Sequence, residues 1–500
     1  MKVALLYPCW TGEYGLFGHF ARRNATWPPL NLALLGAVAG RYGHEVMIID
    51  GEAERLSEEK MVERVFSLKP DIIGLTCYSP FFHVNASLAE CLKKVNSKIP
   101  IMVGGPHITI MKEKALLPQF DYAFIGDAEK SFPQFLELYE NGGDISQVKG
   151  IIYRKGGEVI CTGDSEWVQS DVPTKGSNVG QSYPLDQFPF PARHLLPMNR
   201  YRLGTMHGRK HFTSIQTMRG CPWKCIFCAS EALNTTRVIL RSPESVVEEI
   251  KQVVTNYPYL THFYIVDDVL TLWKQHITRI CDLINEAGLK ITFEGSTRAN
   301  LVDDELIAYL AKSGLIRLSF GLETTDPEMR TTMQKKVPLD AYVRANEICQ
   351  KYGVEAMNSM MIGLPGETRE TIRTSLKWLR EARAVKQANF AIAVPYPGTK
   401  FHEIALAGTH GVQLMVSEDF SRYLRYGSAV TTVGELTPQD LIDLQNEGFV
   451  SIYSAPWRWI PMLRKHGIFG GLLMMLRVIK LWLRKFTRRA KPFRVHPGLP

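Results

Sequence analysis

The sequence has no acidic charge near its C-terminal end. No Asp or Glu follows Glu447, while eleven Lys and Arg residues do, and these eleven exceed the net charge of +9 of the whole chain. A nucleic-acid-binding domain carries its basic residues as a patch or stripe on a folded surface. Because the excess positive charge is confined to the tail, a general nucleic-acid-binding surface is excluded and no nucleic-acid partner is expected.

Long apolar runs are also absent. No stretch reaches about 18 uninterrupted apolar residues, the length that a membrane-spanning helix requires. The apolar run at residues 2–7 is too short for a signal peptide and predicts a first β-strand. Nine cysteines, three of them clustered, favour a reducing compartment in which thiolates stay free. We therefore expect a cytoplasmic protein.

A fourth ligand is missing beside the clustered cysteines. Cys221, Cys225 and Cys228 form a C-x3-C-x2-C pattern, and the next cysteine, Cys281, lies far downstream. A structural zinc site normally closes with four ligands, as does an iron–sulfur cluster that only carries electrons. Three thiolates in one short loop therefore indicate a cubane cluster with one iron open to a chelating ligand. Zinc binding or buried structural cysteines is the alternative.

With Phe227 directly before Cys228, this motif resembles that of the radical S-adenosylmethionine (SAM) superfamily. The resemblance implies a 4Fe-4S cluster whose open iron chelates the amino and carboxylate groups of SAM. It also implies an external one-electron reductant, since reduction cleaves SAM to a 5′-deoxyadenosyl radical.

The first third of the chain alternates short apolar strands with helices. This alternation predicts an α/β fold with a doubly wound, flavodoxin- or Rossmann-like parallel sheet. Ligands bind such sheets at the carboxyl ends of the strands. The expected strands are residues 2–7, 45–49, 71–76, 99–103 and 122–125.

The segments WPPL (27–30), GGPH (104–107) and FIGDAE (124–129) resemble the cobalamin-binding domain that precedes the radical SAM domain in class B enzymes. The resemblance implies cobalamin contacts at five positions. The D-x-H-x-x-G signature of a cobalt-ligating histidine is absent, and His19 is the nearest candidate. We therefore expect cobalamin bound without histidine ligation. The five expected contacts are Thr76, Gly104, Gly105, Gly126 and Glu129.

Two alternatives remain open for this domain. It can be a flavodoxin-like domain that binds nothing, because fold does not fix function. It can also belong to a methylthiotransferase, in which Cys9, Cys77 and Cys91 would hold a second cluster. Cys91 lies in a helical pattern, which favours a structural cysteine.

We expect a cobalamin-binding domain at 1–145, a linker at 146–211, a radical SAM domain at 212–400 and a helical region at 401–500. In the third of these, six strand–helix units with polar residues after each strand predict a partial (β/α)6 barrel. By resemblance, SAM contacts Phe227, Asp267 or Asp268, Ser296, Arg298 and Glu323. An internal Arg298–Glu323 salt bridge is the alternative for that pair.

The C-terminal region is expected to form helices at 405–426 and 437–453. Residues 471–488 form a basic amphipathic pattern that suits the surface of an anionic membrane. A solvated helix packed on the protein is the alternative. The pattern favours peripheral contact with the inner face of a membrane and a lipid- or isoprenoid-like substrate.

The resemblance implies an enzyme, most simply a C-methyltransferase with a small-molecule substrate. The adenosyl radical would take hydrogen from an unactivated carbon, and methylcobalamin would deliver the methyl group. A cyclase or oxidase of the anaerobic magnesium-protoporphyrin ester cyclase type is one alternative, and a non-enzymatic cobalamin carrier or sensor is another. The catalytic residues themselves are not predicted.

Overall fold

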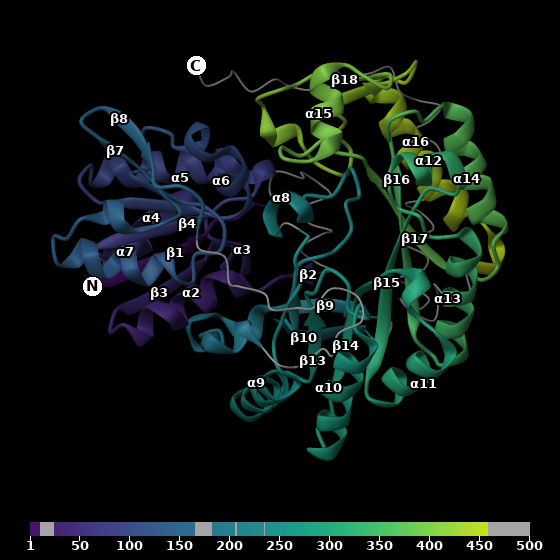
Figure 1. Ribbon diagram of the computed structural model, residues 1–500, viewed down its shortest axis with the longest axis horizontal. Helices are drawn as coiled ribbons and strands as arrows, with labels where there is room; N and C mark the ends of the chain where they lie inside the picture. Colours follow the sequence, from purple (N-terminus) through teal and green to yellow (C-terminus); the bar gives the residue numbers. More distant parts are fainter. Residues whose placement is uncertain (11–24, 166–182, 206–207, 235, 459–500) are drawn as a thin grey trace.

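The computed structural model describes residues 1–10, 25–165, 183–205, 208–234 and 236–458, which form two large sheets with their covering helices (Figure 1). The N-terminal sheet has seven strands in the order β3-β1-β4-β5-β6-β7-β8. Its first five strands are parallel and follow the flavodoxin-like order. This confirms the doubly wound fold. The strands are β1 (Lys2–Tyr7), β3 (Glu45–Asp50), β4 (Ile72–Thr76), β5 (Ile101–Gly104), β6 (Tyr122–Phe124), β7 (Ile151–Lys155) and β8 (Glu158–Cys161).

Alternate residues of β1 belong to two different apolar clusters. Val3 and Leu5 pack in one cluster, and Ala4 and Leu6 pack in the other. A strand that is apolar on both faces is buried on both faces, as parallel sheets require. Helices α2 (Leu30–Arg41) and α7 (Ser131–Glu140) contribute to the first cluster, and α4 (Glu58–Leu68) and α5 (Phe82–Val95) contribute to the second.

The second sheet is a curled half-barrel of eight strands in the order β17-β16-β15-β14-β13-β10-β9-β2. The six strands from β10 to β17 in this sheet are parallel, which confirms the partial (β/α)6 barrel. They are β10 (Gly208–Ile215), β13 (His262–Ile265), β14 (Thr292–Thr297), β15 (Leu315–Glu323), β16 (Glu355–Ile362) and β17 (Gln387–Ile392). The helices between them are α9 (Pro243–Asn256), α10 (Lys274–Glu286), α11 (Asp304–Lys312), α13 (Leu339–Lys351) and α14 (Arg369–Glu381).

A short segment of the N-terminal region also belongs to the barrel sheet. Strand β2 (Ala25–Thr26) pairs antiparallel with β9 (Arg202–Thr205), which in turn pairs antiparallel with β10. The chain therefore extends the barrel edge before it builds most of the N-terminal sheet, so the two sheets share an edge segment as well as a linker.

The C-terminal region differs from the sequence-based expectation. The predicted helix at 405–426 is wrong, because α15 (Lys400–Ala407) ends at Gly408 in the left-handed conformation (φ 65°). A hairpin of β18 (Val412–Leu414) and β19 (Thr431–Val433) follows, with the short 3-10 turn η9 (Phe420–Arg422) between its strands. The second predicted helix is confirmed as α16 (Pro438–Tyr453). Residues 471–488 lie outside the described residues.

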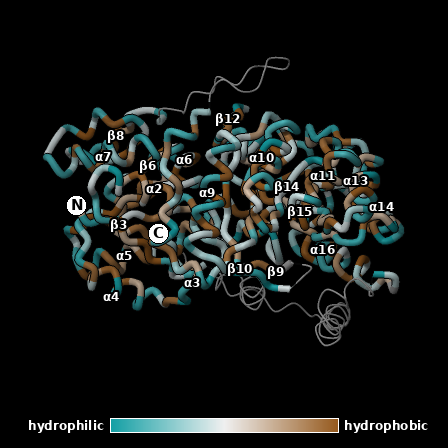
Figure 2. The backbone as a smooth tube through the Cα atoms, turned by 90° about the horizontal axis from the view of Figure 1, so that it is seen from below, coloured by the Kyte–Doolittle hydropathy of each residue, from teal (hydrophilic) through white to brown (hydrophobic). Residues whose placement is uncertain are grey.

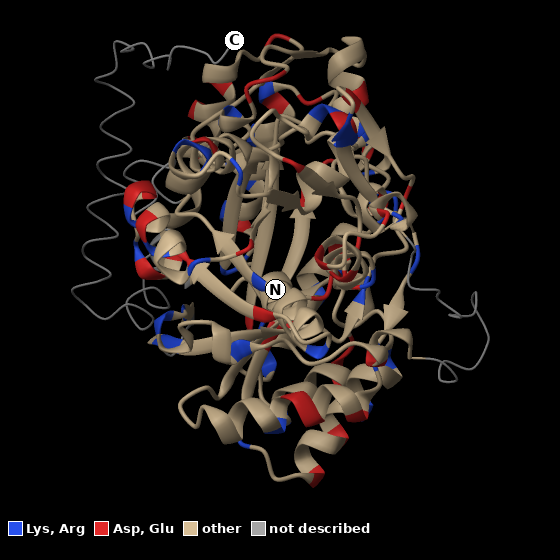
Figure 3. Ribbon diagram, turned by 90° about the vertical axis from the view of Figure 1, so that its left-hand side faces the viewer, with Lys and Arg blue, Asp and Glu red and all other residues tan. Residues whose placement is uncertain are grey.

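Hydropathy and charge follow this architecture. Hydrophobic stretches run through the interior of both halves, with hydrophilic stretches toward the outside (Figure 2). In the described part of the chain, acidic and basic residues are interspersed over the surface helices (Figure 3). A search of these residues finds no helix that is long and apolar enough to cross a membrane.

Candidate active site

The three clustered cysteines lie in one loop at the carboxyl end of β10. This cysteine loop (residues 220–229) runs from β11 (Met218–Arg219) to the short helix α8 (Ser230–Asn234). The loop turns tightly within itself, since the Cys228 amide donates to the Cys225 carbonyl at 3.0 Å. All three cysteines are free thiols in partly exposed residues, so none of them is committed to a disulfide or enclosed in the apolar core.

A buried carboxylate fixes the start of the cysteine loop. Asp267 accepts hydrogen bonds from the backbone amides of Thr217 at 2.8 Å and Met218 at 3.0 Å, and from the Thr217 hydroxyl at 2.5 Å. Burial raises the pKa of Asp267 to about 6. Both of its oxygens are used inside the protein, so Asp267 acts here as a support for the loop.

Two further contacts hold the loop in place. Gly220 has φ 98°, and a Cβ at this position would lie 2.0 Å from the Arg237 carbonyl oxygen. The Ile226 amide donates to the Met333 carbonyl at 3.2 Å, and the Ile226 carbonyl accepts from the Phe401 amide at 2.8 Å. The loop is thus clamped at its start and between its second and third cysteines.

The donor set of the loop fits a cluster. Burial raises the pKa of Cys228 to about 11 and also raises that of Cys221, so binding of iron must displace thiol protons. Among the described residues, no three His, Cys, Asp or Glu side chains are placed to hold a single metal ion. A cubane cluster spreads its thiolate ligands over different irons. The loop therefore favours the 4Fe-4S cluster over a zinc ion.

Arg298 is a buried cation beside this loop. Its guanidinium carbon lies 4.1 Å from the ring centroid of Trp223, which stands between the first two cysteines. In the described part of the chain Arg298 forms no ion pair, and its Nε has no hydrogen-bond partner. The alternative of an Arg298–Glu323 salt bridge is therefore not formed. A guanidinium in this state is suited to bind a carboxylate in two places.

Glu323 pairs instead with a residue that the sequence did not indicate. Lys335 Nζ lies 2.7 Å from Glu323 Oε1 and 5.8 Å from the centroid of the Phe227 ring. A Cβ at Gly321 would lie 2.3 Å from both charged atoms, so a larger residue there would displace the ion pair. Lys335 follows a helix and not a strand. The pattern of polar residues after strands therefore did not indicate it.

Asp268 and Ser296 are the other predicted SAM contacts. Asp268 accepts from the Ser230 hydroxyl at 3.1 Å and lines the main cavity. Ser296 Oγ lies 3.3 Å from the Tyr264 hydroxyl. Of the two aspartates, Asp268 is thus the one that faces open space. The contacts of both residues with SAM stay predictions.

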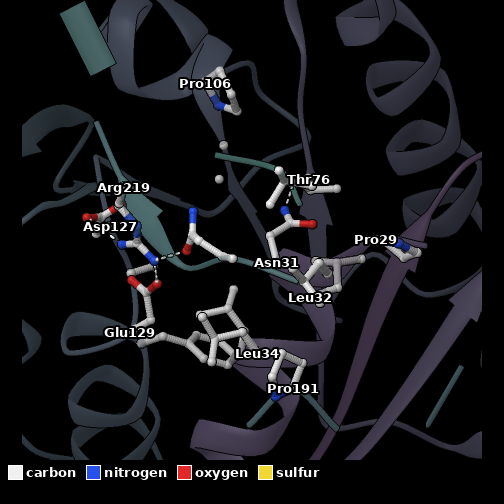
Figure 4. A pocket seen from close by; sticks show the side chains of 18 of the residues that line it. Pro29, Asn31, Leu32, Leu34, Thr76, Pro106, Asp127, Glu129, Pro191 and Arg219 are labelled. Atoms are coloured by element: carbon white, nitrogen blue, oxygen red, sulfur yellow. Dashed lines mark hydrogen bonds and ion pairs between the residues drawn. The ribbon is translucent and has the colours of Figure 1, made fainter. Parts of the chain in front are cut away.

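A cavity of about 560 Å³ lies between the N-terminal sheet and the barrel (Figure 4). All five residues expected to contact cobalamin line it: Thr76, Gly104, Gly105, Gly126 and Glu129. They come from the carboxyl ends of β4, β5 and β6. The facing wall is formed by β11, by the first residue of the cysteine loop and by the segment that follows β13, through Met218, Arg219, Gly220, Val266 and Asp268.

The lining of the cavity fits a bulky ring system. Gly105 has φ 102°, and a Cβ there would lie 2.9 Å from the Cys77 carbonyl oxygen. The backbone path at Gly105 therefore requires glycine, and Gly104 and Gly105 line this wall of the cavity with backbone alone. Among the described lining residues there is no histidine, and His19 lies outside the described residues. The lower ligand of cobalt stays a prediction.

Two proline-containing segments complete the cavity. The ring of Trp27, in the WPPL segment, packs edge-on against Phe212 at 5.1 Å and Tyr264 at 4.7 Å between centroids. The linker segment at 188–191 also lines the cavity. It is held next to the barrel because buried Arg193 pairs with Glu249 at 2.6 Å. The exact domain boundaries stay a prediction.

Comparison with known proteins agrees with this arrangement. Residues 19–136 match the B12 binding domain and residues 215–379 match the radical SAM superfamily. An uncharacterized methyltransferase of Pyrococcus horikoshii is 28% identical over 87% of this chain and 89% of its own length. The structure of the radical SAM methyltransferase TsrM of Kitasatospora setae, solved with cobalamin and a 4Fe-4S cluster, has a TM-score of 0.69 at 15% identity and covers 97% of this chain and all of its own.

Other relatives show a range of reactions. The hopanoid C-3 methylase of Methylococcus capsulatus is 27% identical over 74% of this chain and 67% of its own length. An anaerobic magnesium-protoporphyrin IX monomethyl ester cyclase of Rubrivivax gelatinosus is 26% identical over 79% of this chain and 68% of its own.

The chain is therefore a radical SAM enzyme that carries a cobalamin-binding domain ahead of its barrel. More specifically, its B12 binding domain and its radical SAM domain stand in the order of the cobalamin-dependent radical SAM enzymes, and the relatives named above include methyltransferases of that group. Its cofactors are a 4Fe-4S cluster, SAM and cobalamin. The cofactors predicted from the sequence are confirmed, and the individual contact residues remain to be tested.

Proposed function

We propose that this enzyme methylates an unactivated carbon of a small-molecule substrate. The observation that carries the proposal is the shared cavity: one space is lined by the glycine-rich strand ends of the N-terminal sheet and by the start of the cysteine loop. A substrate carbon placed there lies between the two cofactor sites. When bound, the cluster and SAM supply the hydrogen-abstracting radical, and cobalamin supplies the methyl group.

The residues of the chain bind the cofactors, orient them toward the substrate and shield the reaction from water. Cys221, Cys225 and Cys228 would hold the cluster, and Arg298 would hold the SAM carboxylate through its planar fork. Asp268, which lines the cavity, is suited to accept a hydrogen bond from the SAM amino group. The linker segment at 188–191 excludes water from one side of the cavity, which protects a radical from side reactions.

The products of SAM distinguish methylation from the alternatives. Full-length enzyme, prepared without oxygen with cluster and cobalamin and then reduced, is expected to form both 5′-deoxyadenosine and S-adenosylhomocysteine. Deoxyadenosine without S-adenosylhomocysteine would instead support a cyclase or oxidase, the reaction type named for the Rubrivivax relative. Neither product from protein loaded with both cofactors would support a carrier or sensor. Cys225→Ala is the cluster-free control.

For the substrate, we propose a lipid- or isoprenoid-like molecule that is reached at the inner face of a membrane. Two observations support this: a hopanoid methylase is among the relatives, and the tail has eleven basic residues and no acidic one after Glu447. Anionic membranes attract such segments by about 1 kcal/mol per basic residue. The full chain should sediment with phosphatidylserine vesicles more than with phosphatidylcholine vesicles. Equal sedimentation with both kinds of vesicle would contradict peripheral contact. So would unchanged binding after residues 471–500 are removed.

A further inference from the structure

A buried ion triad joins the cobalamin-binding domain to the cysteine loop. Arg219 Nη1 lies 2.7 Å from Asp127 Oδ2, and Arg219 Nη2 lies 2.8 Å from Glu129 Oε1. Figure 4 shows the guanidinium held between the two carboxylates at the edge of the cavity. Gln216 also accepts from Arg219 Nη2, at 3.3 Å. This triad was not indicated by the sequence.

Each end of the triad belongs to a different cofactor site. Asp127 and Glu129 follow β6 in the same loop as Gly126, which is expected to contact cobalamin, and all three line the cavity. Arg219 ends β11 and stands two residues before Cys221. The three charged side chains therefore form a direct link between the loop expected to face cobalamin and the start of the cysteine loop.

Movement at Arg219 must be passed on to Cys221. The residue between them, Gly220, is pressed against the Arg237 carbonyl so closely that a Cβ would lie 2.0 Å from its oxygen. Arg219 itself pairs in register with Ile239 in the two-stranded sheet of β11 and β12 (Ile239–Leu240). The backbone of Arg219 and Gly220 is thus fixed by strand pairing on one side and by a position that admits only glycine on the other, so the place of the Arg219 guanidinium bears directly on the place of Cys221, two residues later.

The triad is also unbalanced in charge. Two carboxylates surround one guanidinium, and the side chains of Arg219 and Glu129 are only 11% and 7% exposed. Glu129 Oε2 has no hydrogen-bond partner among the described residues. A buried acceptor without a donor is costly, and cobalamin carries peripheral amide groups that donate hydrogen bonds. A ligand in the cavity therefore completes the triad.

We propose that the Arg219–Asp127–Glu129 triad couples the two cofactor sites, so that binding of cobalamin sets the cysteine loop for SAM. Arg219 is a positioning residue, because it acts through Cys221 and not on the substrate. Coupling between sites is reciprocal: cobalamin should tighten SAM binding, and SAM should tighten cobalamin binding by the same factor. The inference needs only the two cofactors, so it does not depend on which substrate is methylated.

The test measures the equilibrium affinity for SAM in full-length, cluster-loaded enzyme with and without hydroxocobalamin. In the natural protein we expect cobalamin to tighten SAM binding about fivefold or more. Arg219→Gln should bring this ratio close to one, while each cofactor alone still binds. The spectrum of the reduced cluster by electron paramagnetic resonance should respond to cobalamin in the natural protein and not in the variant.

Lys224→Gln is the matched control. Lys224 lies in the same loop and pairs with Glu231 at 2.8 Å, but its side chain is 60% exposed, so the coupling ratio should stay at the natural value. If Arg219→Gln does not fold, Glu129→Gln keeps the side-chain volume and the Asp127 pair, and an intermediate ratio is expected. A ratio of one in the natural protein, or an unchanged ratio in the folded Arg219 or Glu129 variant, would overturn the proposal.

Discussion

The barrel has buried ionisable side chains at both ends, and the two ends differ in whether each of these side chains has a partner within the protein. At the end where the strands begin, His262 pairs with Glu294 at 2.9 Å, and Arg317 pairs with Glu294 and Glu355, each at 2.9 Å. Arg317 also donates to the Gly204 carbonyl at 3.0 Å. We call these four side chains the lower charge layer. Each of them forms an ion pair or a hydrogen bond with another of the four.

At the end where the strands finish, the charges are not all matched. Lys335 and Glu323 form a pair, but Arg298 lies beside the cysteine loop with no carboxylate partner in the described part of the chain. A buried ion that is left alone is unfavourable unless a ligand completes it. Burial of charge by itself therefore does not mark a functional site in this barrel. What marks it is a buried charge whose partner is missing from the protein.

The comparison would fail most completely if the upper end held no cluster. Changing Cys225 to Ala should remove most of the bound iron and reduce SAM cleavage to the background rate. The reason is that three thiolates hold three of the four irons and leave the fourth open for SAM, whereas two thiolates do not hold the cluster. Iron content and 5′-deoxyadenosine formation measure this. Cys349→Ala is a suitable control, since Cys349 is buried in the apolar core away from the loop. Retained iron and turnover in the Cys225 variant would contradict the assignment.

The lower charge layer should matter for stability and not for SAM. Replacing Arg317 by Met leaves Glu294 and Glu355 buried without their cation, so the free energy of unfolding should fall by about 3–5 kcal/mol. Chemical denaturation measures the loss. Lys274→Gln is the control, because its ion pairs are largely exposed and exposed pairs contribute little to stability. Weakened SAM binding in a folded Arg317 variant would contradict the claim that the lower charge layer serves stability alone.

Arg298 should show the opposite behaviour. Arg298→Gln removes a cation that has no ion-pair partner in the described part of the chain and loses only its contact with the Trp223 ring, so stability should change by less than about 2 kcal/mol. SAM affinity of the cluster-loaded enzyme should fall about 30-fold or more, the cost of removing a charged contact. Arg298→Lys should recover only part of it, because Lys lacks the planar fork. Unchanged SAM affinity in Arg298→Gln would exclude this residue from the carboxylate site.

The sequence predicted the parallel strands of both sheets and several of the polar residues that follow them, because apolar strands and the polar residues after them are local patterns. It did not predict which charges would meet. Asp127 and Arg219 lie far apart in the chain, and their pairing exists only once the two sheets face each other across the cavity. Lys335 was missed because it follows a helix, and its contact with Glu323 is likewise a tertiary one. These are tertiary contacts without a local signal.

Neighbouring residues also proved ambiguous. Asp267 and Asp268 are equivalent in the sequence, yet the first supports the backbone of the cysteine loop and the second lines the cavity. Side-chain direction at the end of a strand depends on the backbone path, which one sequence does not determine. The helix expected at 405–426 failed because apolar spacing continues past Gly408, where the left-handed backbone ends α15. The prediction gave more weight to the apolar residues after position 408 than to Gly408, although glycine commonly ends a helix.

Glu367 offers the finest test of the comparison, as a buried carboxylate that has amide donors in place of a cation. It accepts from the amides of Gly363 at 2.6 Å and Leu364 at 2.9 Å. Burial raises its pKa from 4.5 to about 7. Between these two values the folded state binds a proton that the unfolded state has lost, so stability falls as the pH rises until the folded pKa is passed.

From pH 6 to pH 8 this carboxyl should destabilise the protein by about 1 kcal/mol, as linkage gives for a shift of this size. Glu367→Gln keeps an oxygen for the two amide donors but cannot ionise. The difference in unfolding free energy between the variant and the natural protein should therefore grow with pH, while contributions from all other groups cancel. A difference that does not change with pH would mean that Glu367 is matched by a charge after all, like the carboxylates of the lower charge layer.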